Sequence, residues 1–279
     1  RRGLAALAAL SLSSCATVDP VTGQKVNNMY LLQDDIQLGR EVMQDTVKTM
    51  REAKVPVNAD KKRVAQLDQM VKRIAAVSHL PDLPYEVYLF QTNIVNAAAA
   101  PGGQVMVFSG LYDKKEGLVA DEDELAAVLG HEIAHVTCRH TTEEMTRQLP
   151  MNIILLGAGI YAEAKGKEDL ALALGAGFLL YEGLLLPKYS RKDEAEADAV
   201  GLMYMAKAGY DPRAAVRLWK RAYEREGDDS LLALFSSHPS NKARYRALEK
   251  MLPQAMSEYA RVKGGYPADY QAPAGAPVR

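Results

Sequence analysis

The sequence lacks the features that mark several classes of protein. Its 279 residues contain two cysteines, Cys15 and Cys138, so a disulfide framework is excluded. The net charge is −1, and no cluster of lysine and arginine with interleaved aromatic residues occurs, so no nucleic-acid partner is expected. With 48% apolar and 25% charged residues, the composition instead suits a globular enzyme with one large core.

No apolar run reaches the roughly 20 residues that a membrane-spanning helix needs. Residues 4–12 are apolar, follow Arg1 and Arg2, and lead to small residues before Cys15, which is typical of a secretory signal. Residues 170–186 are apolar except for Glu182 but contain three glycines. We therefore expect residues 151–186 to form buried or lid helices, with membrane association as the alternative.

The residues HEIAH, at positions 131–135, have the spacing of a metal-binding helix. Positions i and i+4 lie about 40° apart around a helix, so His131 and His135 can direct ring nitrogens to one ion. Glu132 lies beside them and could take a proton from a zinc-bound water. Asp121 and Glu124 form a capping-box pattern that predicts the start of this helix. The alternative is a buried helix whose two histidines form hydrogen bonds in the core.

A second acidic pattern can complete a metal site. Glu194 and Asp198 are also four residues apart, and they share one face of a predicted helix. Glu194 would be the third metal ligand and leave the fourth position to water. Asp198 would accept the spare ring N–H of a histidine ligand and fix its tautomer. We predict one Zn²⁺ per chain; the alternative is a solvated, charged helix face.

These patterns resemble a known family. HEIAH followed by YSRKDEAEAD (residues 189–198) is similar to the HtpX and CaaX-protease family of zinc metallopeptidases, family M48. The resemblance covers residues 16–250 and is nearest to periplasmic lipoprotein or BepA-like members, here without a tetratricopeptide-repeat domain. Weaker similarities are VNA (95–97), PGG (101–103), SGL (109–111) and DPVTG (19–23).

The resemblance also extends to His238, Pro239 and Ser240 with Arg244, which are similar to the His-Pro loop of the family. It implies that His238 lies near the metal and has a catalytic role. His238 could donate a hydrogen bond to the oxyanion, or it could be a fourth ligand that keeps the enzyme latent. Arg244 and Asp198 are expected to contact the metal ligands without binding the metal themselves.

The expected fold is α+β, mostly helical and gluzincin-like, with a small antiparallel sheet beside the zinc helix. Apolar patterns predict helices at 33–54 and 59–78, and strands at 85–91 and 103–109. The expected organisation is a lipoprotein signal peptide (1–15), a zinc metallopeptidase domain (16–263) and a disordered tail rich in Gly, Pro and Ala (264–279).

The predicted function is a zinc-dependent endopeptidase of the bacterial cell envelope that hydrolyses misfolded or misassembled proteins, with Glu132 as the base. The small residues before Cys15 resemble a bacterial lipobox, in which the lipidated cysteine would anchor the protein to a membrane in the periplasm, and Ala16 resembles the outer-membrane sorting pattern; an ordinary signal peptide is the alternative. A chaperone-like or binding module that keeps a latent zinc site is the second function considered. Cys138 is expected as a small buried residue, with a soft contact near the metal as the alternative.

Overall fold

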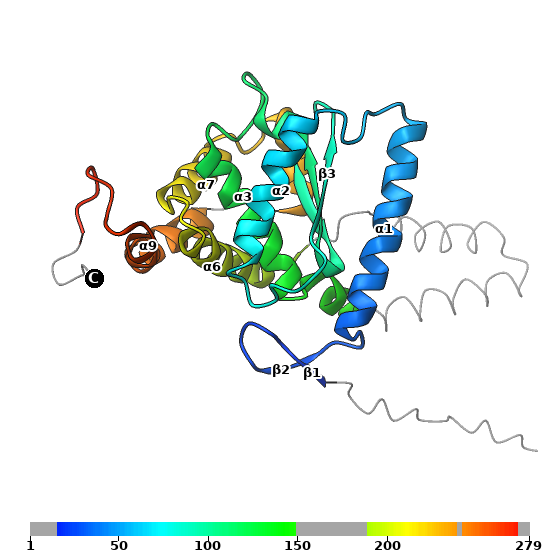
Figure 1. The fold of residues 1–279 in the computed structure, drawn as a ribbon, viewed down its shortest axis with the longest axis horizontal. Helices are drawn as coiled ribbons and strands as arrows, with labels where there is room; N and C mark the ends of the chain where they lie inside the picture. The colour runs from blue at the N-terminus through cyan, green and yellow to red at the C-terminus, as the bar shows by residue number, and fades with distance from the viewer. Residues whose placement is uncertain (1–15, 149–188, 239–241, 273–279) are drawn as a thin grey trace, which may run out of the picture.

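The computed structural model describes residues 16–148, 189–238 and 242–272 (Figure 1). The predicted lid or membrane segment at 151–186 and the predicted lipidation site, Cys15, lie outside these ranges. Among the described helices, none combines the length and the apolar character needed to cross a membrane.

A central three-stranded sheet has the order β3 (Glu86–Phe90), β5 (Gln104–Phe108), β4 (Ala97–Ala100). A separate short hairpin pairs β1 (Ala16–Val18) with β2 (Lys25–Asn27). The named helices are α1 (Leu32–Glu52), α2 (Lys61–Ala75), α3 (Glu122–Thr137), α6 (Arg191–Lys207), α7 (Arg213–Glu224), α8 (Leu232–Ser237) and α9 (Lys242–Lys263), and residues 140–148 are helical as well. The predicted α+β class is confirmed.

The central sheet is mixed, whereas the sequence predicted antiparallel pairing. Strand β4 pairs antiparallel with β5, but β3 pairs with β5 in parallel register, Glu86 opposite Gln104. The reason is that the chain crosses from β3 to the far edge, forms β4, and turns back at Pro101–Gly103 to place β5 between them. Strand β4 was not predicted because its four alanines have weak β propensity.

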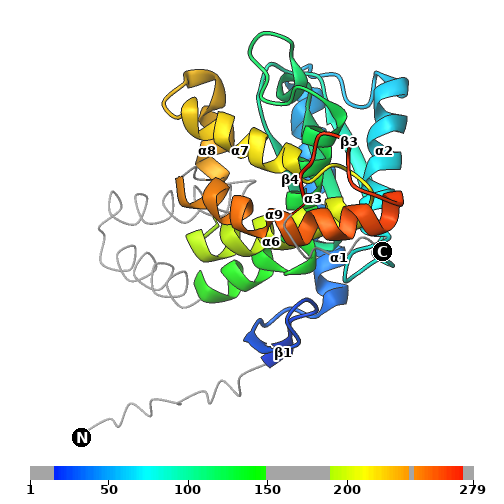
Figure 2. The ribbon, with the colours of Figure 1, turned by 90° about the vertical axis from the view of Figure 1, so that its left-hand side faces the viewer.

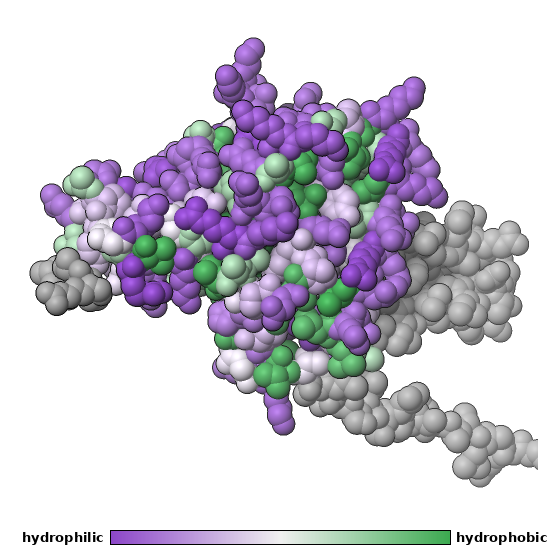
Figure 3. All heavy atoms as spheres, in the orientation of Figure 1, coloured by the Kyte–Doolittle hydropathy of each residue, from purple (hydrophilic) through white to green (hydrophobic). Residues whose placement is uncertain are grey.

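The sheet separates two apolar clusters. Helix α1 lies on one face, and helices α2 and α3 lie on the other (Figure 1). Alternate residues of β5 face opposite sides of the sheet. Val105 and Val107 belong to the main core, whereas Met106 and Phe108 pack with Met43 of α1. The face drawn in Figure 3 is largely hydrophilic. The exposed large apolar residues of the N-terminal part are Val18, Met29, Leu31 and Leu32.

Helix α3 is buried from Glu124 to Thr137 and lies at the centre of the molecule (Figure 2). It begins as predicted, because the Asp121 side chain accepts a hydrogen bond from the Glu124 backbone N–H at 2.8 Å. The second half of the capping box does not form. The Glu124 carboxylate accepts instead from Ala120 N–H, at 2.8 Å, and from the guanidinium of Arg221 on α7.

Helices α3 and α6 touch backbone to backbone at Gly130 and Gly201. A Cβ atom added to Gly201 would lie 2.8 Å from the carbonyl carbon of Gly130 and 2.8 Å from the backbone nitrogen of His131. Such distances are far inside van der Waals contact, so neither glycine can carry a side chain without separating the helices. This contact places α6 directly against the HEIAH segment.

Part of the segment predicted as a disordered tail is described, namely residues 264–272. The Gly265 N–H donates to the Ala260 carbonyl at 2.9 Å, and Asp269 forms an ion pair with Arg213 of α7 at 2.9 Å. These contacts hold the chain against the helical layer after α9. Residues 273–279 lie outside the described ranges.

We predict that Gly201→Ala destabilises the protein although alanine is the better helix former by about 1 kcal/mol. The added methyl group would clash with the backbone of α3, so the free energy of unfolding should fall by about 1–3 kcal/mol. Urea unfolding followed through the fluorescence of the single tryptophan measures this change. Ala195→Ser, on the exposed side of α6, is the control and should change stability by less than about 0.5 kcal/mol. Equal stability of Gly201→Ala and the parent protein would contradict the close crossing.

Candidate metal centre

Four buried side chains converge where α3, α6 and the end of α8 meet. His131, His135, Glu194 and His238 each offer one ligand atom, and these atoms all lie within 4.8 Å of one another. The Nε2 atoms of His131 and His135 are 3.0 Å apart. His135 Nε2 lies 3.3 Å from Glu194 Oε1, and His131 Nε2 lies 3.6 Å from Glu194 Oε2. This is the one such cluster found among the described residues.

The spacing of these atoms fits a small divalent cation. Ligands of a tetrahedral zinc ion at about 2.0–2.1 Å lie about 3.3 Å from one another. The two Nε2 atoms are 3.0 Å apart, and they lie 3.3 and 3.6 Å from the two carboxylate oxygens of Glu194, which is close to that value. The donor set, two imidazoles and one carboxylate, is also a common set for zinc. A metal ion therefore fits the residues present.

His238 approaches the same point from the end of α8. Its Nδ1 lies 2.9 Å from Glu194 Oε1 and 3.3 Å from His131 Nε2. Its Nε2 lies 3.5 Å from Glu132 Oε1. His238 is thus beside both the metal ligands and the predicted base, as the family resemblance implied.

Arg244 supports the cluster from behind. It donates two hydrogen bonds to Asp198, from Nε and Nη2, each at 2.7 Å, and its Nη1 lies 2.6 Å from Glu194 Oε2. Asp198 Oδ1 in turn lies 3.0 Å from His131 Nδ1. The guanidinium carbon is 4.1 Å from the ring centroid of Trp219, which also lies beside the His131 ring. One arginine therefore orients two carboxylates, of which one holds a histidine.

Burial and neighbouring charges set the protonation of these groups. Burial raises the pKa of Glu132 above its ordinary value. Burial opposes ionisation of Glu194 as well, but His238 and Arg244 outweigh it and hold the pKa of Glu194 well below its ordinary value. Burial lowers the pKa of His135 well below 6.5, which favours the neutral imidazole that binds metals. The Glu194 side chain therefore favours the carboxylate form, whereas burial of Glu132 favours the protonated form more than in an exposed glutamate.

The structure brings together every residue that the sequence placed at the site. Glu132 lies on the same buried helix as the histidines, and Asp198 and Arg244 lie against them. Cys138 is buried and lies outside the metal cluster, as expected for a small core residue. Burial raises the pKa of its thiol far above its ordinary value, so the thiolate is disfavoured.

Three residues beside the cluster were not predicted from the sequence. Tyr189 stacks on the His135 ring with a centroid distance of 3.8 Å, and His140 Nδ1 lies 2.9 Å from His135 Nδ1. Trp219 is brought in by α7. Tyr189 precedes the predicted Glu194 helix and His140 follows HEIAH closely, so nearness in sequence was an available signal for both. No local signal pointed to Trp219.

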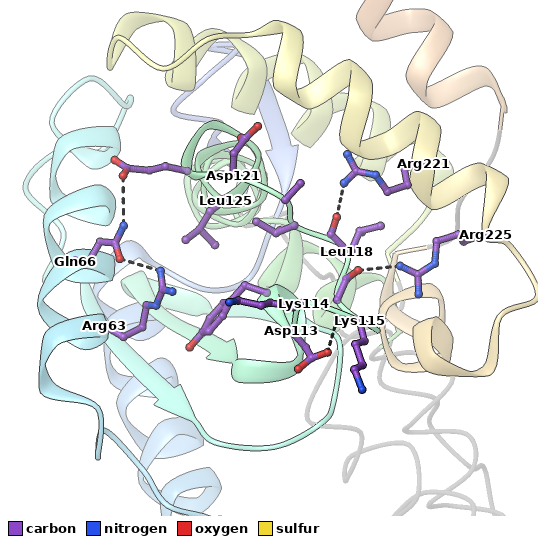
Figure 4. Close-up of a pocket in the computed structure, with 15 residues that line it drawn as sticks. Arg63, Gln66, Asp113, Lys114, Lys115, Leu118, Asp121, Leu125, Arg221 and Arg225 are labelled. Atoms are coloured by element: carbon purple, nitrogen blue, oxygen red, sulfur yellow. Dashed lines mark hydrogen bonds between the residues drawn. The ribbon is translucent and has the colours of Figure 1, made fainter.

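The described residues also line two cavities that are distinct from the metal cluster. One, of about 650 Å³, lies at the N-terminal end of α3, between α2, α7 and the loop before α3 (Figure 4). Arg221 and Arg225 close one side by donating to the carbonyls of Leu118 and Gly117. The other, of about 540 Å³, lies between α6 and α9 and has Asp198 and Arg244 in its wall. Neither contains a metal-cluster ligand.

A buried helix with two histidines and a glutamate, completed by a glutamate from a second helix, defines the HExxH class of metallopeptidase sites with a glutamate as third ligand. The chain belongs to peptidase family M48, whose family model matches residues 61–252. The family assignment made from the motifs is confirmed.

Curated relatives occur in eukaryotes and bacteria. The mitochondrial metalloendopeptidase OMA1 of Schizosaccharomyces pombe is 43% identical over 192 residues, which are 68% of this chain and 53% of the relative. The human metalloendopeptidase OMA1 is 31% identical over 185 residues, 64% of this chain and 34% of the relative. The β-barrel assembly-enhancing protease of Yersinia pestis is 30% identical over 172 residues, 60% of this chain and 34% of the relative. The chain thus spans about half or less of these relatives' lengths.

The mitochondrial relatives, which include fungal, plant and animal proteins, contradict the predicted location. The prediction of a periplasmic lipoprotein of the outer membrane, anchored through Cys15, is therefore wrong. The physical reason is that a short apolar segment with arginine and serine and without acidic residues is typical of leaders to more than one compartment. Residues 1–15 alone could not distinguish between them.

We predict that Arg244→Met destabilises the chelator-treated protein by about 3–5 kcal/mol, because Glu194 and Asp198 would become buried charges without a cation. The free energy of unfolding in urea measures the effect. Arg261→Met is the matched control. Arg261 is 61% exposed and pairs with Glu258 at 2.8 Å, so its loss should cost less than about 1 kcal/mol. Similar effects of the two substitutions would show that the buried carboxylates do not depend on Arg244.

Proposed function

We propose that this protein is a zinc-dependent endopeptidase that hydrolyses peptide bonds in extended segments of misfolded or misassembled proteins. The observation that carries the proposal is a buried glutamate, Glu132, on the same helix as the two histidines of a four-residue metal cluster. Family membership supports a metallopeptidase.

His131, His135 and Glu194 would hold the ion. When bound, Zn²⁺ supplies a Lewis acid that polarises the scissile carbonyl and makes water a stronger acid. Asp198 and Arg244 keep the ligands in place, since Asp198 contacts His131 and Arg244 contacts Glu194.

Glu132 would move the protons. Its carboxylate would take a proton from the attacking water and would later deliver that proton to the leaving nitrogen. Its pKa is raised by burial, so both uptake and release of the proton fall closer to neutral pH than for an exposed glutamate. The other two carboxylates described at the cluster suit this role less well, because Glu194 and Asp198 both have lowered pKa values and are held by Arg244.

The substrate would bind as an added strand. Strand β4 is one of the two edges of the central sheet, and it packs on α3, which carries the two histidines. An extended chain paired with β4 would run beside the cluster, and main-chain hydrogen bonds would supply affinity with little demand on sequence. This mode of binding suits unfolded segments of many proteins.

His238 would be a latent fourth ligand. Its Nδ1 points at the cluster and lies nearer to Glu194 Oε1, at 2.9 Å, than its Nε2 lies to Glu132, at 3.5 Å. In this position the imidazole takes the place that water and the substrate carbonyl need, so it would restrain basal cleavage. The alternative role, donation to the oxyanion, requires the ring to move away from the cluster first.

A chaperone-like or binding module with a latent zinc site is the second candidate. Its support is the same contact of His238 with the cluster. Such a module has no use for a buried base, however, and Glu132 is costly to bury because carboxylates lose hydration there. The retained Glu132 therefore favours the enzyme.

We predict that Glu132→Gln keeps one equivalent of zinc but lowers the rate of casein cleavage by at least about 10²- to 10⁴-fold, because the amide cannot accept the proton. Glu122→Gln on the exposed first turn of the same helix is the matched control and should retain the parent rate. Near-normal cleavage by Glu132→Gln would refute the mechanism. A parent protein that binds substrate but cleaves no faster than Glu132→Gln would favour the binding module.

We predict that His238→Ala raises basal casein cleavage and leaves the zinc content unchanged, because the fourth position is freed. The measurement pairs an initial-rate assay with metal analysis of the same sample. His79→Ala, at an exposed histidine, is the control. Slower cleavage with intact zinc would instead show that His238 is a donor to the oxyanion. If neither rate nor zinc content changes, His238 has neither role.

A further inference from the structure

His140 is a buried histidine that the proposed mechanism does not use. It lies two residues beyond the C-cap of α3 and is 2% exposed. Its Nδ1 lies 2.9 Å from Nδ1 of His135, and the two rings meet edge to face, with centroids 5.0 Å apart and planes at 72°. His140 therefore touches a metal ligand on the side opposite the cluster.

A turn at Arg139 brings His140 back to α3. Helix α3 ends at Thr137, and Arg139 then adopts a left-handed conformation with φ 57°. This conformation is unfavourable for a residue with a side chain, and a buried network holds it. The Arg139 guanidinium donates to both oxygens of Asp35, at 2.6 and 3.0 Å, and to the Tyr30 carbonyl at 2.7 Å. The N-terminal part of α1 thus fixes the turn that places His140.

The hydrogen-bond geometry defines which nitrogen carries each proton. His135 presents Nε2 to the cluster, so a neutral ring that binds a metal there carries its hydrogen on Nδ1. Two nitrogens 2.9 Å apart form a hydrogen bond only if one donates and the other accepts. His140 Nδ1 must therefore accept from His135, and the hydrogen of His140 must lie on Nε2.

Glu196 favours this arrangement. Its Oε2 lies 3.6 Å from His140 Nε2, which is beyond a direct hydrogen bond but close enough for attraction to an N–H. Glu196 comes from α6, the helix that also carries Glu194 and Asp198. The acidic side chain lies on the side of His140 away from His135, so it stabilises the tautomer in which Nδ1 is free to accept.

We propose that His140 is a positioning residue for the metal ligand His135, and that Glu196 orients His140 in turn; the proposal rests on the metal site of the proposed function. The two histidine ligands are then held differently. The carboxylate of Asp198 holds His131, whereas the imidazole of His140 holds His135 and is itself oriented by Glu196. His140 fixes the tautomer and the rotation of the His135 ring without touching the metal or the substrate.

The test compares three substitutions of His140 in the full chain, with zinc affinity measured by competition against a chromophoric chelator. Asparagine places its side-chain oxygen where Nδ1 lies and keeps the acceptor, whereas leucine fills the space without one. We expect His140→Leu to weaken zinc binding by about 10- to 100-fold, and His140→Asn to stay within about tenfold of the parent. Glutamine places its amide nearer the Nε2 position, so His140→Gln should bind zinc more weakly than His140→Asn.

A role in folding alone predicts different results. It would lower the unfolding temperature of the chelator-treated variants and leave the visible spectrum of the Co²⁺-loaded protein unchanged. We expect the Co²⁺ bands to shift in His140→Leu and to return towards the parent spectrum in His140→Asn. Glu196→Gln should weaken zinc binding in the parent but add nothing in His140→Leu, because it acts through His140.

The outcomes separate this inference from the proposed function. A parent protein without a zinc equivalent would overturn both. A parent that binds zinc, with His140→Leu binding equally tightly, would overturn only the role of His140. If His140→Leu does not fold, the comparison of His140→Asn with His140→Gln decides, and equal affinities in that pair would also refute the proposal.

Discussion

The metal centre depends on the close crossing of α3 and α6 at Gly130 and Gly201. The cluster takes two ligands from α3, one from α6 and His238 from the end of α8, and Glu194 reaches the two α3 histidines because the two helices nearly touch. His131 directly follows Gly130, so the point of closest approach is also the point where the ligand set begins. Because a Cβ at either glycine would meet backbone atoms that cannot rotate away, the distance between the ligands is fixed by the main chain.

The side chains buried at this helix crossing carry excess negative charge, which explains why the site needs a cation. Glu132, Glu194 and Asp198 are all buried, and Arg244 is the buried cation that contacts two of them. With neutral histidines and ionised acids, three carboxylates against one guanidinium leave two negative charges, which a divalent ion would neutralise. Without an ion, the carboxylates depend on Arg244 and on His131: burial lowers the pKa of His131, but Asp198 and Glu194 outweigh burial and raise it to about 9. The same imbalance that binds a metal therefore lowers stability when the metal is removed.

Contacts between residues close together in the sequence could be predicted, whereas contacts between residues far apart in the chain could not. The pairs His131 with His135 and Glu194 with Asp198 are each four residues apart on a helix, so their shared faces followed from helix geometry. The position of His140 could not be predicted in this way. The turn at Arg139 that places it is held by Asp35, which is 104 residues away in the sequence. Trp219 and the mixed sheet also depend on tertiary packing: α7 brings Trp219 to His131, and β4 is made of alanines without a strand signal.

The central claim is that one zinc ion is held between α3 and α6. Anomalous diffraction at the zinc absorption edge, on crystals of the purified full chain, tests it most directly. The account predicts a single peak enclosed by His131, His135 and Glu194, with full occupancy that is lost after soaking in chelator. A peak elsewhere in the molecule, or a protein that carries a full equivalent of zinc without density at these three residues, would contradict the account.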